Sequence, residues 1–400
     1  MSLTTVLLKP GEADRLVAGH PWLYSNSILR LTGPVADGDW VQVKDHRQRL
    51  LGTGFYNAKS RIAVRILDAD RVEDDRAFLR ARVQSAVDLR RRWMPGATSY
   101  RVVNSESDFL SGLIVDRYED VLVVQISSLG MDRRKADIVA VLQELLQPRS
   151  ILERSDMASR RFEGLPESEG LLAGEPVGAV PITLNGLRFQ ADLAGGHKTG
   201  LYLDQQVNYA AVGELARGAG EVLDCFSFLG GFALHCARAG ARQVLGLDQS
   251  ATAVTAAGEH ARANGLAERA RFEAANVFDW LKAATAVGPH ERVIPRYDLI
   301  ILDPPSFTRN RASVPDALRG YKEIHLRAMK LLRPGGMLAT FCCSHHVGRD
   351  LFEEVILAAA YDTRQVFRRV ASYTQSPDHP VIPAIAETEY LKGFAYERVR

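Results

Sequence analysis

The chain has 400 residues, of which 46% are hydrophobic and 24% are charged, and its formal net charge is +2. This composition is that of globular proteins and excludes a largely disordered chain. The length predicts two or three domains at roughly 150 residues each. Four cysteines are too few for a secreted disulfide framework, and no apolar run reaches the roughly 18 residues of a membrane helix. We therefore expect a soluble, cytoplasmic protein with no signal peptide and no membrane contact.

Residues 1–72 are predicted to form a small β-barrel domain. Strand-like segments at 41–43 and 62–67 are separated by glycine-containing turns. The stretch 41–65 carries six basic side chains against one acid, and Arg90–Arg92 add a second basic cluster. Such a local concentration suits a polyanion partner, although a solvated strand face would have the same composition. The six basic residues are Lys44, Arg47, Arg49, Lys59, Arg61 and Arg65.

Residues 73–186 are predicted to form an α+β middle domain with the order strand-strand-helix-strand-strand. The Gly/Pro/Glu-rich run 164–181 is expected to be a loop. The expected elements are a first helix over 74–92, a hairpin at 113–118 and 121–126, a helix over 132–146, and strands at 150–154 and 182–184.

Residues 187–400 show alternating strand and helix patterns. Alternating units of this kind predict an α/β domain with a parallel, doubly wound, Rossmann-like sheet. The strands are expected at 221–224, 244–248, 271–273, 297–302 and 337–341.

Acidic residues stand at the ends of three of these strands. Ligands of doubly wound sheets bind outside the carboxyl ends of the strands, where Asp224, Asp248 and Asp303 are expected. Gly230-Gly231 stands where a helix begins and lets the backbone approach a ligand. No G-x-G-x-x-G pattern is present here, and an acid near the helix start disfavours pyrophosphate and favours a cationic cofactor. The alternative is a Gly-Gly turn with ordinary strand-end acids.

The order of these motifs, with Asn276-Val277-Phe278 and Asp303-Pro304-Pro305, resembles the class I S-adenosylmethionine-dependent methyltransferases. The glycine loop departs from the richer pattern usual in that superfamily. The resemblance implies S-adenosylmethionine as the cofactor. The cofactor-binding residues that it implies are Asp224, Phe226, Ser227, Gly230, Gly231, Asp248, Asn276, Val277 and Asp303.

A narrower resemblance spans nearly the whole chain. The segments 197–205, 225–232 and 303–307, Cys343-Ser344, and the terminal 378–394 are similar to the bacterial large-subunit ribosomal RNA cytosine-C5 methyltransferases, type I. In that family a PUA domain, here suggested by His20-Pro21-Trp22 and 52–57, precedes the middle and methyltransferase domains. The resemblance implies large-subunit ribosomal RNA as the partner. The substrate-binding residues that it implies are Lys198, Tyr202, Pro304, Pro305 and Phe307.

Methylation of cytosine C5 needs a thiolate that adds to C6, a donor at N3 and a base for the C5 proton. Cys342 and Cys343 are adjacent at a strand end, where successive side chains point to opposite faces, and spacing alone does not choose between them. The family match places Cys343 in the catalytic position. Asp303 is expected at cytosine N3 or N4, because an acid there can share a proton with the base. Phe307 is either a stacking platform for the base or a core aromatic. Candidates for the base are His345, His346, Asp378 and His379.

Three questions stay open at the level of the sequence. Asp-Pro-Pro followed by an aromatic also occurs in enzymes that methylate a nitrogen, for instance of guanine in rRNA, without covalent catalysis. A non-catalytic RNA-binding assembly factor could keep the same fold, although the intact acids argue against it. The oligomeric state is undetermined, with a homodimer through the N-terminal domains as one option. No metal site is expected, because Cys342–His346 lacks a second ligand pair at structural-zinc spacing.

Overall fold

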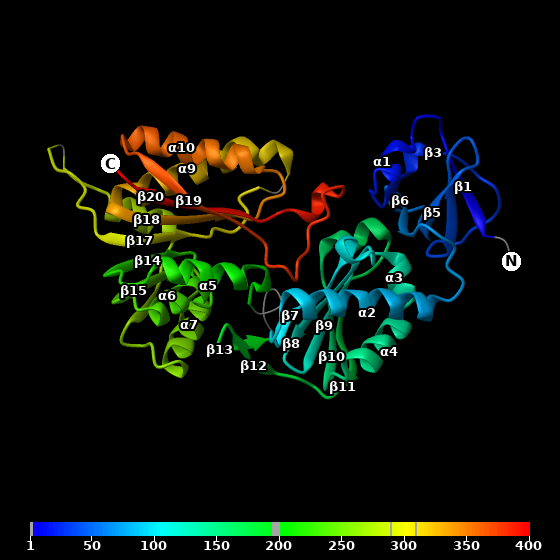
Figure 1. The fold of residues 1–400 in the computed structure, drawn as a ribbon, viewed down its shortest axis with the longest axis horizontal. Coiled ribbons are helices and arrows are strands. Elements are labelled where there is room, and N and C mark those ends of the chain that lie inside the picture. Colours follow the sequence, from blue (N-terminus) through cyan, green and yellow to red (C-terminus); the bar gives the residue numbers. More distant parts are fainter. Residues whose placement is uncertain (1–2, 194–200, 289, 309) are drawn as a thin grey trace. The chain divides into compact units, whose positions relative to one another are not determined.

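The computed structural model describes residues 3–193, 201–288, 290–308 and 310–400 (Figure 1). The described residues divide into two compact units. The first comprises those of Met1–Ile182, Ala191–Leu203 and Pro377–Thr388, and the second those of Thr183–Gln190, Asp204–Ser376 and Glu389–Arg400. Within the described ranges, none of the helices combines the length and apolar character that a bilayer crossing requires.

The first sheet of the N-terminal unit has the strand order β2-β6-β5-β4-β1-β3. Strands β1 and β4 pair in parallel, and the other neighbours pair antiparallel. Alternating apolar residues such as Val41, Val43 and Val64 turn inward and form a small core. The elements are β1 (Thr4–Leu8), α1 (Asp14–Val17), β2 (Trp22–Tyr24), β3 (Ile28–Leu31), β4 (Trp40–Lys44), β5 (Leu50–Tyr56) and β6 (Ile62–Asp68).

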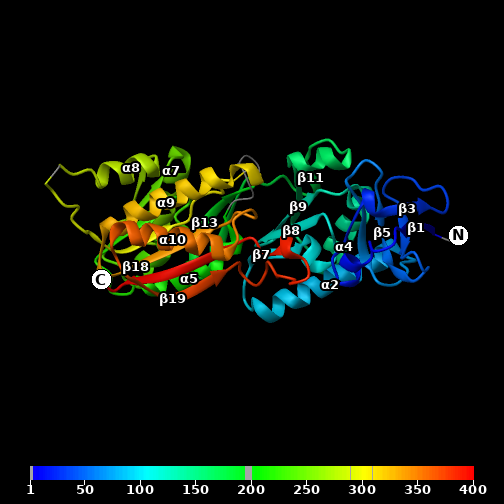
Figure 2. The ribbon, with the colours of Figure 1, turned by 90° about the horizontal axis from the view of Figure 1, so that it is seen from above.

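A second sheet of this unit has the order β11-β10-β9-β8-β7. Helices α2 and α4 lie side by side along it (Figures 1 and 2) and share one apolar core with its strands. Asp74 begins α2 by accepting a hydrogen bond from the Ala77 N–H. The elements are α2 (Asp75–Trp93), β7 (Ser99–Asn104), β8 (Leu113–Tyr118), β9 (Val121–Ile126), α3 (Leu129–Arg133), α4 (Lys135–Leu146), β10 (Ser150–Ser155) and β11 (Ser168–Gly174).

The prediction for the middle region was wrong in two respects. The expected loop 164–181 contains β11, an edge strand whose side chains are mostly exposed, so that it lacks the apolar alternation by which strands are identified. The expected strand at 182–184 does not join this sheet but belongs to β12 (Ala179–Leu184), which pairs with β13 (Leu187–Asp192) in a separate two-stranded sheet. Strand β7 was not predicted.

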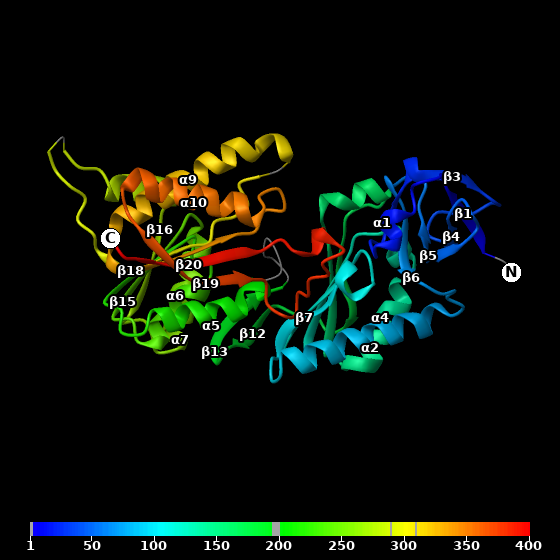
Figure 3. The ribbon, with the colours of Figure 1, turned by 45° about the horizontal axis from the view of Figure 1, so that its top comes forward.

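The second unit contains a sheet of order β16-β15-β14-β17-β18-β20-β19, parallel from β16 to β18. The strand order reverses between β14 and β17, which makes their carboxyl ends a topological switch point. Figures 1 and 3 show α9 and α10 on one face of the sheet and α5, α6 and α7 on the other. The elements are α5 (Gln206–Leu215), β14 (Glu221–Cys225), α6 (Gly231–Ala239), β15 (Gln243–Asp248), α7 (Ala251–Ala263), β16 (Ala270–Ala274), α8 (Val277–Ala284), β17 (Tyr297–Leu302), α9 (Val314–Leu331), β18 (Leu332–Cys342), α10 (Arg349–Thr363), β19 (Phe367–Thr374) and β20 (Lys392–Arg398).

Candidate active site

Three carboxyl groups lie at the carboxyl edge of the parallel strands. Cys225, the last residue of β14, is in register with Leu247 of β15 and with Leu302 of β17. Asp248 and Asp303 each come one residue after these partners, and Asp224 comes one residue before Cys225, so the three acids lie within two residues of one another along three neighbouring strands. Like charges gathered at one edge are costly unless they bind cationic or proton-donating partners.

Asp224 is fully buried, and one of its oxygens is unsatisfied. Its Oδ2 accepts a hydrogen bond of 2.9 Å from the Ala233 N–H in the first turn of α6. Its Oδ1 has no hydrogen-bond partner among the described residues. Burial, together with the charges of Asp303 and Asp248, raises the pKa of this carboxyl well above its usual range. A ligand with a cationic donor would satisfy the unpaired oxygen.

The loop between β14 and α6 offers a second unsatisfied group. Asp248 holds this loop by accepting hydrogen bonds of 2.9 Å from the N–H groups of Phe228 and Ser250. The buried Ser227 hydroxyl has no partner among the described residues. An acceptor and a hydroxyl left unpaired beside Asp248 fit the ammonium and hydroxyl groups of S-adenosylmethionine.

Neighbouring aromatic side chains leave no room for a Cβ at the two glycines of this loop. Gly230 has φ +85°, and a Cβ on it would lie 2.9 Å from the ring of Phe272. A Cβ on Gly231 would lie 2.6 Å from the ring of Tyr209. The sequence predicts glycine here because the backbone approaches a ligand closely. The structure adds a second cause, because the start of α6 packs directly against two aromatic side chains.

Half-buried phenylalanines provide an apolar surface at the same edge. The ring of Phe278 lies 6.4 Å from that of Phe226 and 5.6 Å from that of Phe307. Asn276 caps α8 by accepting from the N–H groups of Phe278 and Asp279. Val277 is buried in the core, so its side chain is not available to a cofactor. Phe278 comes directly after Asn276 and Val277 but was not predicted as a site residue. Its position just after the N-cap of a helix was the signal available in the sequence.

The environment of Phe307 bears on its two proposed roles. Its ring centroid lies 4.6 Å from that of Tyr321, which is buried in the core, and Phe307 itself packs against the same core only in part. One part of the ring therefore stabilises the loop after β17, and the remaining part is accessible.

Asp303 is held by residues that the sequence reasoning did not single out. The Gln205 side-chain N–H donates to Asp303 Oδ2 at 3.1 Å, and Asn208 in turn donates to Gln205 at 2.7 Å. Burial and the charge of Asp204 raise the pKa of Asp303 to about 7, against the opposing effect of Gln205. The Tyr390 hydroxyl donates to Asp204 at 2.7 Å. The Asp-Gln pair just before a helix was the signal available in the sequence.

Cys342 and Cys343 have different environments, as expected from strand alternation. Cys342 is completely buried, and its thiol lies 3.4 Å from the Tyr321 hydroxyl. Cys343, one residue beyond β18, is partly exposed. The neighbouring loops are tied together, because the hydroxyls of Ser344 and Thr308 share a short hydrogen bond.

Lys392 is a buried cation close to Cys343. Its Nζ donates to the carbonyl of Ser344 at 2.5 Å and to that of Val347 at 2.6 Å, and no carboxylate of the described residues forms an ion pair with it. Burial lowers the pKa of Lys392, while the nearby thiols of Cys342 and Cys343 act in the opposite direction. A cation so placed favours the thiolate form of a neighbouring cysteine.

The other predicted site residues fall in several places. Pro304 is buried and Pro305 is exposed, Tyr202 is 39% exposed, and Lys198 lies outside the described residues. His345 and His346 are exposed in the turn after Cys343. Two other candidates for the base belong to the first unit, where the Asp378 carboxylate accepts from the Arg101 N–H at 2.9 Å and contacts His379 at 3.1 Å.

The basic clusters are smaller on the surface than the sequence suggests. Arg65 is mostly buried and pairs with Glu163 at 2.9 Å, and Arg90 is fully buried and pairs with Asp108 at 2.5 Å. Both were counted as parts of a polyanion-binding face, and both instead stabilise the interior of the first unit. Of the two clusters, Arg47, Arg49, Lys59, Arg61, Arg91 and Arg92 are exposed.

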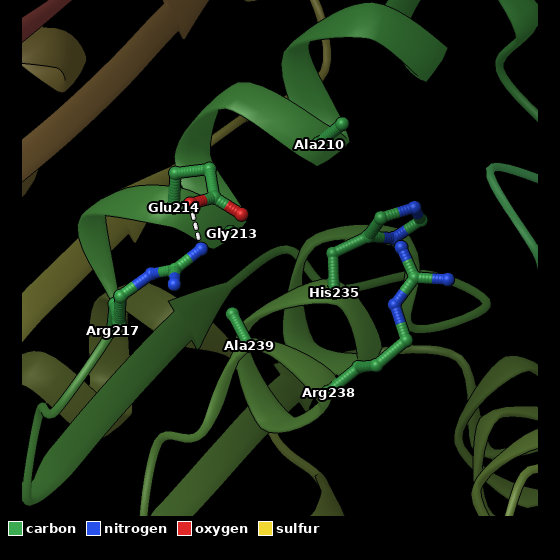
Figure 4. A pocket seen from close by; sticks show the side chains of 7 residues that line it. All are labelled: Ala210, Gly213, Glu214, Arg217, His235, Arg238 and Ala239. Atoms are coloured by element: carbon green, nitrogen blue, oxygen red, sulfur yellow. Dashed lines mark hydrogen bonds and ion pairs between the residues drawn. The ribbon is translucent and has the colours of Figure 1, made fainter.

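A separate pocket of about 300 Å³ lies between α5 and α6 (Figure 4). Its charged lining is satisfied within the protein, because Arg217 pairs with Glu214 and Arg238 donates to the Asn185 carbonyl. Burial lowers the pKa of His235 to about 4 and keeps this ring neutral. Within the described residues, no group of three His, Cys, Asp or Glu side chains is placed to hold a metal ion.

Comparison with known proteins agrees with this geometry. Residues 6–69 match the model of a PUA-like domain, and residues 154–390 match that of an S-adenosylmethionine-dependent methyltransferase. The fold is similar to that of a methyltransferase, SMU.776, crystallised with SAH, with a TM-score of 0.83 and 22% identity over 99% of this chain and 100% of that one. The protein is thus an S-adenosylmethionine-dependent methyltransferase with a PUA-like domain, which confirms the predicted fold class and cofactor.

Relatives with higher identity define the family more narrowly. The chain is 37% identical to the ribosomal RNA large subunit methyltransferase I of Klebsiella pneumoniae over 98% of this chain and 97% of the relative. It is 39% identical to the protein of that name from Shewanella amazonensis over 97% of this chain and 98% of the relative. The chain belongs to the family of these proteins, the ribosomal RNA large subunit methyltransferases I.

Proposed function

We propose that the protein methylates carbon 5 of a cytosine in large-subunit ribosomal RNA through a covalent bond between Cys343 and C6. The names of the relatives support large-subunit ribosomal RNA as the substrate, and the side chains of the site support the reaction. The observation that carries the proposal is a partly exposed cysteine at the same sheet edge as a carboxyl group whose pKa is about 7. The corresponding domain division is 1–72 for RNA binding, 73–186 for the middle domain and 187–400 for catalysis.

The residues of the chain divide the reaction between them. The Cys343 thiolate forms a bond to C6, and the electron pair of the C5–C6 double bond moves toward N3 as protonated Asp303 donates a proton there. S-adenosylmethionine, when bound, supplies the electrophilic methyl group that C5 takes. A base then removes the C5 proton, the sulfur–C6 bond breaks to restore the double bond, and Asp303 recovers its proton from N3. The Cys343 thiolate is regenerated.

The pKa of Asp303 suits this role. A carboxyl group with a pKa about 7 is protonated in about half of the molecules at neutral pH, and so it donates and recovers a proton at little cost. An exposed aspartate would be ionised and could only accept. Burial and Asp204 thus create the donor that cytosine N3 requires, and the Tyr390 hydroxyl keeps Asp204 in place.

The substrate base has to leave any stacked duplex before C5 and C6 can reach Cys343. Cofactor binding is assigned to Asp224, Ser227 and Asp248, with the apolar surface of Phe226, Phe278 and Phe307 nearby. The exposed basic residues of the first unit would contact phosphates and position the RNA.

The test is nucleoside mass spectrometry of large-subunit rRNA after reaction with isotopically labelled S-adenosylmethionine. Wild-type protein should produce labelled 5-methylcytidine, and Cys343→Ala should reduce it by at least about three orders of magnitude. Cys342→Ala is the matched control and should retain most activity. Label on a guanine nitrogen that survives Cys343→Ala would establish the nitrogen methyltransferase instead. Absence of S-adenosylmethionine binding would favour the assembly factor.

A further inference from the structure

The short helical turn Ala158–Glu163 holds an exposed aromatic side chain on an anchored backbone. Phe162 is 73% exposed, and the side chain of Arg161 beside it is 72% exposed and lies 3.8 Å from the exposed carboxylate of Glu167. The residues on either side of this pair, Arg160 and Glu163, are both buried. The turn therefore presents Arg161 and Phe162 outward while its flanks are fixed in the protein.

Arg160 anchors the turn to the middle sheet. Its guanidinium donates to the carbonyls of Pro166 at 2.6 Å and Ile126 at 2.5 Å, and to Asp132 at 3.1 Å. Three directional bonds from one buried guanidinium leave the backbone of residue 160 little freedom. The backbone that carries Phe162, two positions later, is consequently restrained, while the Phe162 side chain itself is exposed.

Glu163 anchors the same turn to the PUA-like domain. Its carboxylate accepts hydrogen bonds from Ser60 at 2.6 Å, Arg65 at 2.9 Å and Asn57 at 3.0 Å. Burial opposes its ionisation, but the Arg65 charge and these donors outweigh burial and keep its pKa below the usual range. The turn is thus fastened to the β5–β6 loop.

The fastened loop adds two further exposed cations. Lys59 and Arg61 flank Ser60, and the Lys59 stem lies so close to Gly164 that a Cβ there would be 2.8 Å from Lys59 Cδ. One exposed ring and three exposed cations thus belong to two segments that are joined by Glu163. We name this group of side chains the Phe162 platform; its members are Lys59, Arg61, Arg161 and Phe162.

We infer that the Phe162 platform binds a single-stranded segment of the RNA substrate, with an unpaired base stacked on the Phe162 ring and phosphates on the cations. The inference rests on the proposed function, because it assigns the RNA contact of the same enzyme. The charge favours a polyanion, and an aromatic face among cations is the arrangement by which proteins bind unpaired bases. A duplex offers no unstacked base to such a ring.

The experiment measures binding of the full chain to a fluorescein-labelled 12-nucleotide RNA by anisotropy, as a single strand and as a duplex. Phe162→Ala should weaken single-strand binding about 10- to 100-fold and leave the salt dependence unchanged. Arg61→Ala should reduce the magnitude of the slope of log affinity against log salt by about one. Tyr361→Ala removes an 84% exposed aromatic of α10 and is the matched control, expected to bind like wild type.

Three outcomes would overturn the inference: single-strand affinity unchanged in Phe162→Ala, equal losses for single strand and duplex, or a change of oligomeric state in sedimentation without a change in RNA affinity. The last would identify the platform as a contact between copies of the chain. The proposed function fails separately, since it depends on labelled 5-methylcytidine and not on this affinity. Unchanged RNA binding with normal cytosine methylation would reject the platform alone.

Discussion

Buried charges are treated differently in the two units of the molecule. In the first unit, the buried guanidiniums have carboxylate partners: Arg90 pairs with Asp108, Arg65 with Glu163 and Arg160 with Asp132. At the carboxyl edge of the second unit, the buried Asp224 and Lys392 and the half-buried Asp303 form no ion pair with any described residue. In the first unit, the buried charges are neutralised by other side chains of the protein. At the carboxyl edge of the second unit, they are neutralised only when a ligand or a proton binds.

The difference separates structural from functional charge. A buried pair is neutral overall, and its removal on one side leaves an uncompensated charge that destabilises the fold. An unpaired buried group costs folding free energy in the native state, so it persists where ligand binding or catalysis requires it. Variants in the first unit should therefore change stability, and variants at the edge should change affinity, pH dependence or reactivity.

Arg90→Met should produce the largest loss of stability. It leaves the Asp108 carboxylate buried without its cation and removes the donors to the Arg101 and Asp378 carbonyls. The free energy of unfolding, measured with urea, should fall by about 3–5 kcal/mol. The neighbouring Arg91→Met is the control, because that side chain is 66% exposed and its loss should cost less than about 0.5 kcal/mol. Equal losses of unfolding free energy in the two variants would mean that burial of the Arg90–Asp108 pair does not contribute to stability.

Asp303 should make the protein less stable as the pH rises from about 4 to 7. Its pKa of about 7 lies above the ordinary 3.8, so the folded protein retains a proton that the unfolded chain has released, and this advantage disappears above pH 7. At about 1.4 kcal/mol per pKa unit, the contribution is up to roughly 4 kcal/mol. Asp303→Asn should flatten the curve of unfolding free energy against pH, leaving the part due to Asp224.

Asp298 provides the control of opposite sign for that experiment. Burial opposes its ionisation, but Arg333 and the N–H groups of Glu221 and Gly220 outweigh burial and lower its pKa. Its contribution is present above the ordinary value and is lost as the pH falls below about 4. An Asp303→Asn variant with the wild-type slope between pH 4 and 7 would contradict the assignment.

Asp224→Asn should weaken S-adenosylmethionine binding on the order of 30- to 150-fold, the equivalent of about 2–3 kcal/mol for a charged hydrogen bond. The free energy of unfolding should stay the same or increase, because the variant replaces a buried carboxyl group that has no cationic partner with a neutral amide. Calorimetric titration and urea unfolding measure the two quantities. Asp298→Asn, at the other end of the same sheet, should show the reverse: reduced stability and normal affinity.

The sequence allowed the main features of the edge to be predicted, because they depend on local patterns. The acids at 224, 248 and 303 stand at the ends of apolar strands, and the structure places them together at the edge where parallel strands end. Phe278, Gln205 and Lys392 were missed as site residues because their roles depend on packing between segments distant in the chain. For the same reason Arg65 and Arg90 were assigned to a basic surface: a count of charges does not show which of them meet a carboxylate inside.

Lys392→Met should produce the smallest effect and addresses the comparison most directly, because Lys392 is the buried cation of the edge. Without it, the pH of half-maximal alkylation of Cys343 by iodoacetamide should rise by about one unit, since the thiolate loses a nearby positive charge. The other three cysteines are buried, so alkylation located by mass spectrometry reports on Cys343. Lys392→Arg retains the charge and should keep the midpoint near that of wild type. If both variants alkylate like wild type, Lys392 serves only to hold the carbonyls of Ser344 and Val347, and the contrast between the two units would rest on the carboxylates alone.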